Sequence, residues 1–282
     1  MKENCPSATA LSVAVRRAGH QLTDGHRIFD DPLALRILGV ADGSNPDPGA
    51  HDRSSFSRGL RPFLAARSRY TEDEMHAAVG RGVGQYVVLG AGLDTFAYRS
   101  PYPGETLHVF EVDHPATQQW KRECLSEAGI SIPPALTFAP VDFETETLGD
   151  GLCRAGFDTG APAFFSWLGV TQYLTEDAVA ATLGFVATLA AGSSIVFDYT
   201  IDPSSLMPAA RAAFDFLTAR TAQTGEPFRS FFTPTALIDS LEKMGFGQCR
   251  DVLPEDLNAL YFQGRPDKLS TNGFTHMMNA RV

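Results

Sequence analysis

The residues best suited to chemistry form a glycine turn behind a short apolar run, in the stretch QYVVLGAGLDTFAYR (residues 85–99). A dinucleotide fingerprint has three glycines, the third of which lets a helix pack closely beneath a pyrophosphate. Here Gly90 and Gly92 fill the first two positions and Thr95 the third. The glycines let a ligand approach the backbone, whereas Asp94 repels phosphates and favours a cationic ligand. The turn therefore predicts a cofactor without a pyrophosphate.

Two carboxylates follow at the end of the next apolar run, LHVFEVDHP. Glu111 and Asp113 lie 21 and 23 residues beyond Gly90. A carboxylate at this spacing can accept two hydrogen bonds from a ribose diol, in NAD and in other adenosine cofactors alike. Because the third glycine is missing, we favour S-adenosylmethionine (SAM), with S-adenosylhomocysteine as the product. An NAD(P)-dependent oxidoreductase stays the alternative.

The turn and the segments around it resemble the leucine carboxyl methyltransferase family, in particular its bacterial SAM-dependent branch. The resemblance runs in order from about Arg16 to Gly264. The matching segments are RIFDDPLA, ARSRYTED, VVLGAGLDTFAYR, VFEVDHP, VDFE, SWLGVTQYLT and GEPFRSFFTPTALIDSLEKMGF. Each motif alone is weak, and their order makes the combination specific.

The resemblance implies a set of cofactor ligands. Arg69 binds the carboxylate of SAM, a role that suits the fork of a guanidinium. Gly90 and Gly92 lie against the amino-acid end of the cofactor. Asp113 binds the ribose, and Glu111 turns toward backbone or toward groups behind the site.

The same resemblance assigns the adenine site and exposes one departure. Asp142 accepts from the exocyclic amine, and Phe143 packs against the ring. Many relatives carry a glutamate five residues before Tyr173, where this chain has Leu168. Either backbone carbonyls or Asp94 must then serve the amino-acid end of the cofactor, so we count Asp94 among the cofactor residues.

Methyl transfer from a sulfonium is an in-line displacement, which needs the acceptor held in line with the departing sulfur. A carboxylate acceptor is already ionised at neutral pH and needs a clamp, whereas an alcohol or phenol benefits from a base. The catalytic candidates are Tyr173, after the fourth predicted strand, Arg229, as an anchor for an acidic substrate, and His114, on the substrate side. Each of them is also compatible with an ordinary packing or surface role.

Short apolar runs alternate with helical stretches from residue 85 onward, which is typical of βαβ units around a parallel sheet. With the resemblance, this predicts a class I methyltransferase (Rossmann-like) fold of the α/β class. Its mostly parallel seven-stranded sheet would carry helices on both faces. Residues 1–282 form one domain, with an N-terminal helical cover (1–80) and a helical insert (203–230) as a lid over the acceptor pocket.

Composition excludes several other classes of protein. The net charge of -10 disfavours nucleic acid as a partner. Four scattered cysteines give neither a zinc motif nor a disulfide framework, so we expect no metal. No signal peptide or membrane span is predicted. We expect a cytoplasmic SAM-dependent O-methyltransferase of secondary metabolism that acts on a carboxylate of a small acidic molecule. Hydroxyl or phenol methylation and a non-catalytic SAM-binding role remain open, as does the oligomeric state.

Overall fold

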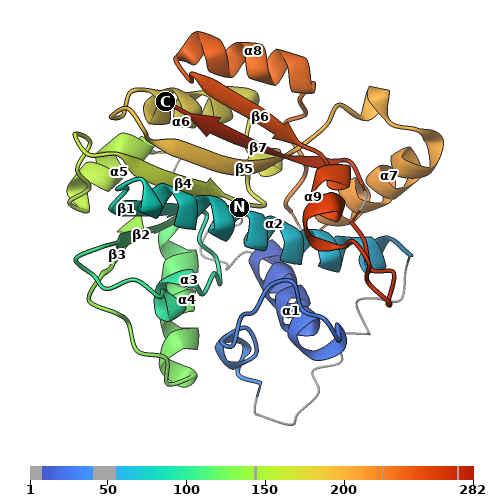
Figure 1. The fold of residues 1–282 in the computed structure, drawn as a ribbon, viewed down its shortest axis with the longest axis horizontal. Helices are drawn as coiled ribbons and strands as arrows, with labels where there is room; N and C mark the ends of the chain where they lie inside the picture. Colours follow the sequence, from blue (N-terminus) through green and yellow to red (C-terminus); the bar gives the residue numbers. More distant parts are fainter. Residues whose placement is uncertain (1–7, 41–54, 143–144, 224, 272) are drawn as a thin grey trace.

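The computed structural model of the chain describes residues 8–40, 55–142, 145–223, 225–271 and 273–282 (Figure 1). Within these residues a seven-stranded sheet is covered by helices on both faces. The strands are β1 (Gln85–Leu89), β2 (His108–Asp113), β3 (Leu136–Pro140), β4 (Ala163–Trp167), β5 (Ser194–Thr200), β6 (Gln248–Val252) and β7 (Thr275–Arg281). The α-helices are α1 (Ala8–Thr23), α2 (Ser55–Gly80), α3 (Phe96–Arg99), α4 (Pro115–Glu127), α5 (Leu148–Arg154), α6 (Glu176–Ala187), α7 (Pro208–Gln223), α8 (Pro234–Met244) and α9 (Pro254–Tyr261). Short 3-10 helices are η1 (Arg36–Leu38), η3 (Thr171–Tyr173) and η4 (Pro203–Ser205).

The strand order is β3-β2-β1-β4-β5-β7-β6. Strands β1 to β5 are parallel, and β7 runs antiparallel to both of its neighbours. Chain order reverses between β1 and β4, whose last residues, Leu89 and Trp167, are paired. Ligands of open α/β sheets bind outside the carboxyl ends of the strands at such a reversal. The glycine turn follows β1 directly, so it lies at this point. The predicted fold class is confirmed.

The central strands are apolar because both of their faces are covered. On one face, side chains of α5, α6 and α8 pack against the sheet around Trp167 and Phe197. On the other face, α2, α3 and α9 pack around Phe164 and Val196. These two layers fix the positions at which the strands end.

The N-terminal helix α1 packs mainly on α2 (Figure 1). A third, smaller apolar cluster joins α1 and η1 to α4 through Ala14, Ile37 and Leu125. The insert carries η4 and α7, and Figure 1 shows α7 beyond the edge where β5 ends and β7 begins. In the described residues no helix has the length and apolar character needed to cross a bilayer. The division into cover, main domain and lid remains a prediction.

Candidate functional site

The glycine turn is held tightly against the sheet and against its cover. Gly90 and Gly92 have φ values of 66° and 43°, in the region that glycine adopts without strain. A Cβ at Gly90 would lie 2.4 Å from Cγ2 of Val170, and one at Gly92 would lie 3.1 Å from Cβ of Ala10. Two segments therefore pack against the turn. One is the loop after β4, which carries Val170, and the other is the start of α1, which carries Ala10.

Asp113 ends β2 beside the turn. Its Oδ2 accepts from the Gly92 N–H (2.6 Å) and its Oδ1 from the His114 N–H (2.7 Å). Burial raises the pKa of the Asp113 carboxyl, and these two backbone bonds oppose the shift. Each carboxylate oxygen has a second lone pair. The fixed carboxylate can therefore accept further hydrogen bonds from a vicinal diol.

Glu111 has different partners from Asp113. It is buried and pairs with the equally buried Lys121 (Oε2 to Nζ, 2.7 Å), while the Tyr98 hydroxyl donates to it at 3.3 Å. Burial raises the pKa of the Glu111 carboxyl to about 7, against the attraction of Lys121. Of the two acids in the EVDHP segment, only Asp113 contacts the turn.

Two arginines of α2 have different surroundings. Arg69 is half exposed, pairs with Asp73 (2.8 Å) and donates to the carbonyl of Ile28. Arg67 is buried, and its Nη1 lies 2.5 Å from Oδ2 of Asp198 on β5. Asp198 in turn accepts from the N–H of Gly169, just after β4. The structure thus places Arg67, and not Arg69, at the carboxyl edge of β4 and β5.

The reason for this difference is helical geometry. Residues two apart on an α-helix point about 200° apart, so Arg67 and Arg69 cannot face the same side. The resemblance of the motif implies Arg69. Arg67 stands in the same segment, and the buried apolar positions Phe63, Ala66 and Tyr70 mark the inner face to which it belongs.

Asp94 and Thr95 tie the turn to the cover. Asp94 accepts from the Phe96 N–H (2.8 Å) and lies 3.4 Å from Nη1 of Arg17 on α1. The Thr95 hydroxyl donates to Asp31 (2.8 Å) and accepts from Arg17 (3.0 Å). Thr95, at the position of the third glycine, is thus buried and hydrogen-bonded to two residues of the N-terminal segment, Asp31 and Arg17.

The predicted adenine site is only partly described. Asp142 is half-buried just beyond β3, and its carbonyl accepts from Thr145. The Val141 N–H donates to the Asp113 carbonyl, which brings the ends of β2 and β3 together. Phe143 lies outside the described residues. Leu168, at the position of the family glutamate, packs against the apolar cluster of α2.

The three catalytic candidates are not equivalent. Tyr173 lies in η3, packs edge-on against Phe228 of the insert (5.4 Å between rings), and its phenol pKa is raised by burial. His114 caps α4, where its Nδ1 accepts from the Ala116 N–H. Arg229 donates its backbone N–H to the Gln172 carbonyl, but its side chain is exposed. Tyr173 is the most enclosed of the three.

The phenylalanine side chains of the insert mostly pack against one another or against the main domain. Phe214 is buried and contacts the rings of Phe228, Phe231 and Phe274. Phe232 packs against Tyr199, whereas Phe216 is exposed. Most of these rings therefore form a small core beneath α7.

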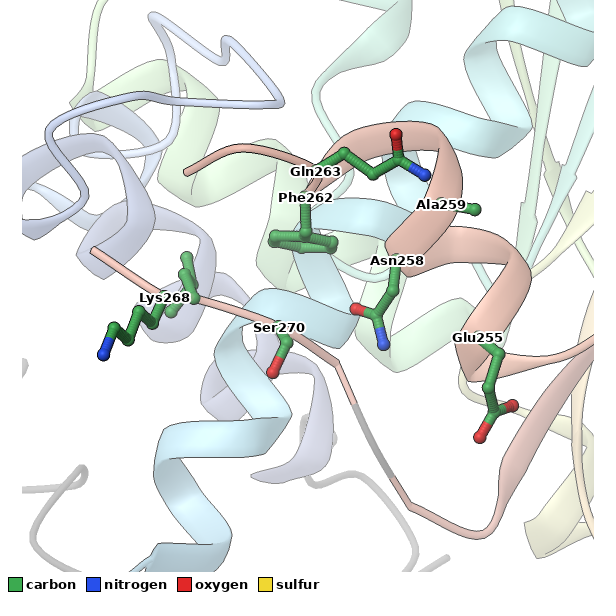
Figure 2. Close-up of a pocket in the computed structure, with 8 residues that line it drawn as sticks. Glu255, Asn258, Ala259, Phe262, Gln263, Lys268 and Ser270 are labelled. Carbon is green, nitrogen blue, oxygen red and sulfur yellow. The ribbon is translucent and has the colours of Figure 1, made fainter. Parts of the chain in front are cut away.

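A cavity of about 470 Å³ lies elsewhere, between α9 and the segment that follows it (Figure 2). Figure 2 shows Asn258 on α9 and Phe262 just after it on one side, and Lys268 and Ser270 of the following segment on the other. None of the candidate residues lines this cavity. In the described part of the chain, no three His, Cys, Asp or Glu residues are grouped as a metal ion would require.

The order of the seven strands, with β7 antiparallel, and the glycine turn after β1 are those of the class I methyltransferase fold. A Thermobifida fusca protein provisionally named a methyltransferase has the same fold with a TM-score of 0.57, at 18% identity over 99% of this chain and 96% of that one. A Streptomyces avermitilis protein of the DUF574 family matches with a TM-score of 0.52, at 16% identity over 90% of this chain and 95% of that one. At these identities the likeness concerns the fold alone.

Sequence comparison gives the family. The leucine carboxyl methyltransferase model matches residues 10–187. The Bacillus subtilis protein YktD, provisionally named as a SAM-dependent methyltransferase, is 34% identical over 99% of each chain. A relative from Mycolicibacterium paratuberculosis with a similar provisional name is 34% identical over 69% of this chain and 74% of its own. The chain therefore belongs to the leucine carboxyl methyltransferase family, as its motifs predicted.

Proposed function

We propose that the chain transfers a methyl group from SAM to a carboxylate of a small-molecule acceptor. The observation that supports this most is the carboxylate of Asp113, held by the Gly92 N–H beside a turn with Thr95 at the third glycine position. The pairing of a ribose acid with a turn unsuited to a pyrophosphate fits SAM better than a dinucleotide. SAM is also named as the cofactor of the relatives.

The described residues fit this cofactor. Asp113 would take the ribose hydroxyls, and Asp142 would lie near the adenine. For the carboxylate of the amino-acid end we propose Arg67 in place of Arg69. Arg67 is buried, and its Nε has no hydrogen-bond partner among the described residues. An arginine with a donor to spare at this edge is suited to a carboxylate.

The cofactor supplies an electrophilic methyl group, and the chain must bind and orient the acceptor. A carboxylate acceptor is ionised at neutral pH and needs no base. Because burial raises its pKa, the Tyr173 phenol stays protonated and can donate a hydrogen bond to such an acceptor. The apolar rings packed around Phe228 exclude water from this side of Tyr173.

One observation favours a hydroxyl acceptor instead. The Thr9 hydroxyl donates to the Glu226 carboxylate, and Glu226 and Thr9 both act on the pKa of Tyr173. A carboxylate next to the acceptor would repel an acid and could take the proton of an alcohol or phenol. Hydroxyl O-methylation is therefore the second candidate.

Two measurements test the proposal. Calorimetry with SAM, S-adenosylhomocysteine and NAD should give binding of the first two only; tight NAD binding without SAM binding would refute it. Labelled-methyl transfer to a panel of acids and phenols separates the two acceptor classes, and an absence of turnover on every acceptor would favour a binding role.

A variant tests the ribose site. Asp113→Ala should weaken SAM binding by about tenfold or more, since it removes the acceptor of the diol. Asp215→Ala, which removes an exposed acid of α7, is the matched control. Unchanged affinity in Asp113→Ala would remove Asp113 from the site.

A further inference from the structure

Among the residues that the structure describes, Arg16 of α1 is a buried cation without an acidic partner. Only 9% of its surface is exposed, its Nη1 donates to the carbonyl and hydroxyl of Ser12 on the same helix, and its Nε has no described hydrogen-bond partner. Among the described residues the other two buried arginines are neutralised. Arg17 pairs with Asp31 and Arg67 with Asp198, each at 2.5 Å. Burying a charge without a counter-charge is costly, so Arg16 lacks the anion that its surroundings require.

The charges around Arg16 increase this need. Burial lowers the pKa of its guanidinium, and so does the charge of Arg220 on α7. No described carboxylate lies within ion-pair distance of either arginine. The charge of the exposed Arg220 on the insert helix thus repels that of the buried Arg16 on the cover helix. An anionic oxygen group bound there would relieve both the burial cost and the repulsion.

The position of Arg16 relates it to the acceptor side. Arg16 is seven residues beyond Thr9, and residues at that spacing lie on the same side of an α-helix. Thr9 contacts Glu226 of the insert and lies beside Tyr173. Seven residues correspond to about 10 Å along the helix axis. Arg16 therefore lies on the acceptor-facing side of α1, about two turns away from the proposed methylation point.

We infer that Arg16 and Arg220 bind a second anionic group of the acceptor, at a distance from the group that is methylated. The acceptor would then be an elongated small molecule with an acid at its far end, either a carboxylate or a phosphate. This inference rests on the proposed function for the identity of the ligand as the acceptor. The buried Arg16 replaces the exposed Arg229 as the main anchor for an acidic substrate. Arg220 is exposed as well, so its contribution is the smaller one.

Binding of diacids tests the inference. Dissociation constants are measured for the linear dicarboxylates from succinate to sebacate, for the matching monocarboxylates and for inorganic phosphate, with S-adenosylhomocysteine present. At least one dicarboxylate should bind about tenfold more tightly than its monocarboxylate, or phosphate should bind measurably. Arg16→Gln should abolish this advantage and Arg220→Gln should reduce it. A preference for dicarboxylates or for phosphate tells which acid the far end carries.

Arg211→Gln is the matched control, because Arg211 is an exposed arginine of α7 that pairs with Asp215. It should bind diacids and phosphate as the wild type does. Equal binding by the wild type and Arg16→Gln would overturn the inference, as would a parallel loss in Arg211→Gln. If the wild type binds no S-adenosylhomocysteine, the proposed function fails; binding of phosphate that depends on Arg16 would then still support an anion site.

A stability measurement excludes a purely structural role. Arg16→Met removes the buried charge and keeps an unbranched apolar stem in place of the methylenes of arginine. In anion-free buffer it should unfold at the same temperature as the wild type or at a higher one. A clear loss of stability would show that the guanidinium serves the fold and would overturn the inference.

Discussion

At the scale of single residues, the site depends on which way a side chain points. Arg67 and Arg69 belong to one motif and have the same chemistry, yet one is buried beside Asp198 and the other pairs with Asp73 near the surface. Helical geometry alone separates them. The motif in the sequence identifies the segment for which a cofactor role is proposed, and burial is needed to choose between its two arginines.

The two arginines give the first prediction. Arg67→Gln should weaken binding of S-adenosylhomocysteine by about tenfold or more, because a charge-assisted hydrogen bond to the carboxylate of the ligand is lost. Arg69→Gln removes an exposed ion pair, which contributes about 0–1 kcal/mol, and should leave affinity unchanged. Calorimetry measures both, and thermal unfolding checks that Arg67→Gln is folded. A larger loss in Arg69→Gln would restore the assignment made from the sequence.

At the scale of elements, the glycine turn and the N-terminal cover form one unit. Thr95 first marks the turn as lacking a third glycine. In the structure its hydroxyl connects Asp31 and Arg17, which are 64 and 78 residues away in the chain. Thr95, whose presence in place of a glycine disfavours a dinucleotide, therefore also binds the N-terminal cover to the turn.

Thr95→Gly separates these two roles. It restores three glycines, G-x-G-x-x-G, but leaves the buried Asp31 and Arg17 with one hydrogen bond fewer. We expect a loss of about 1–3 kcal/mol in the free energy of unfolding and no binding of NAD, because Asp94 and the cover remain. Urea unfolding and calorimetry measure the two effects. Thr95→Ser keeps the hydroxyl and should stay close to the wild type; NAD binding by Thr95→Gly would show that the third position alone selects the cofactor.

The elements that the sequence predicts are those whose pattern is local. Apolar runs such as YVVL and SSIVFDYT locate strands because their residues are buried on both faces. The turn glycines and Asp113 follow strand ends, so their neighbourhood follows from the parallel sheet. The contacts of Ala10 with Gly92 and of Thr9 with Glu226 join distant segments. No spacing in the sequence encodes them, and for the same reason the unpaired Arg16 stayed unnoticed.

At the scale of the whole molecule, a buried ion pair connects β2, the strand that ends in Asp113, with α4. Glu111 on β2 and Lys121 on α4 are each about 1% exposed. Their ion pair links β2, which ends in Asp113, to the next helix along the chain, α4. Replacing buried ion pairs by apolar groups is often neutral or stabilising, so this pair is better regarded as a source of pH dependence than of stability.

The direction of that dependence follows from the pKa of Glu111. Burial raises it from the ordinary 4.5 to about 7, so between these values the folded chain binds more protons than the unfolded chain. The stabilising contribution of Glu111 is complete below pH 4.5 and is lost as the pH rises through 7. Between pH 5 and 8 the free energy of unfolding should fall by up to about 3 kcal/mol from this group.

Urea unfolding across this range measures the slope. The double variant Glu111→Gln, Lys121→Met removes both charges and should flatten the curve. Glu123→Gln changes a surface acid of α4 and should keep the slope of the wild type. The same slope from pH 5 to 8 in the wild type and in the double variant would mean that Glu111 is ionised throughout this range, because it would then bind no protons in either state. The attraction of Lys121 would then outweigh the burial of the carboxylate.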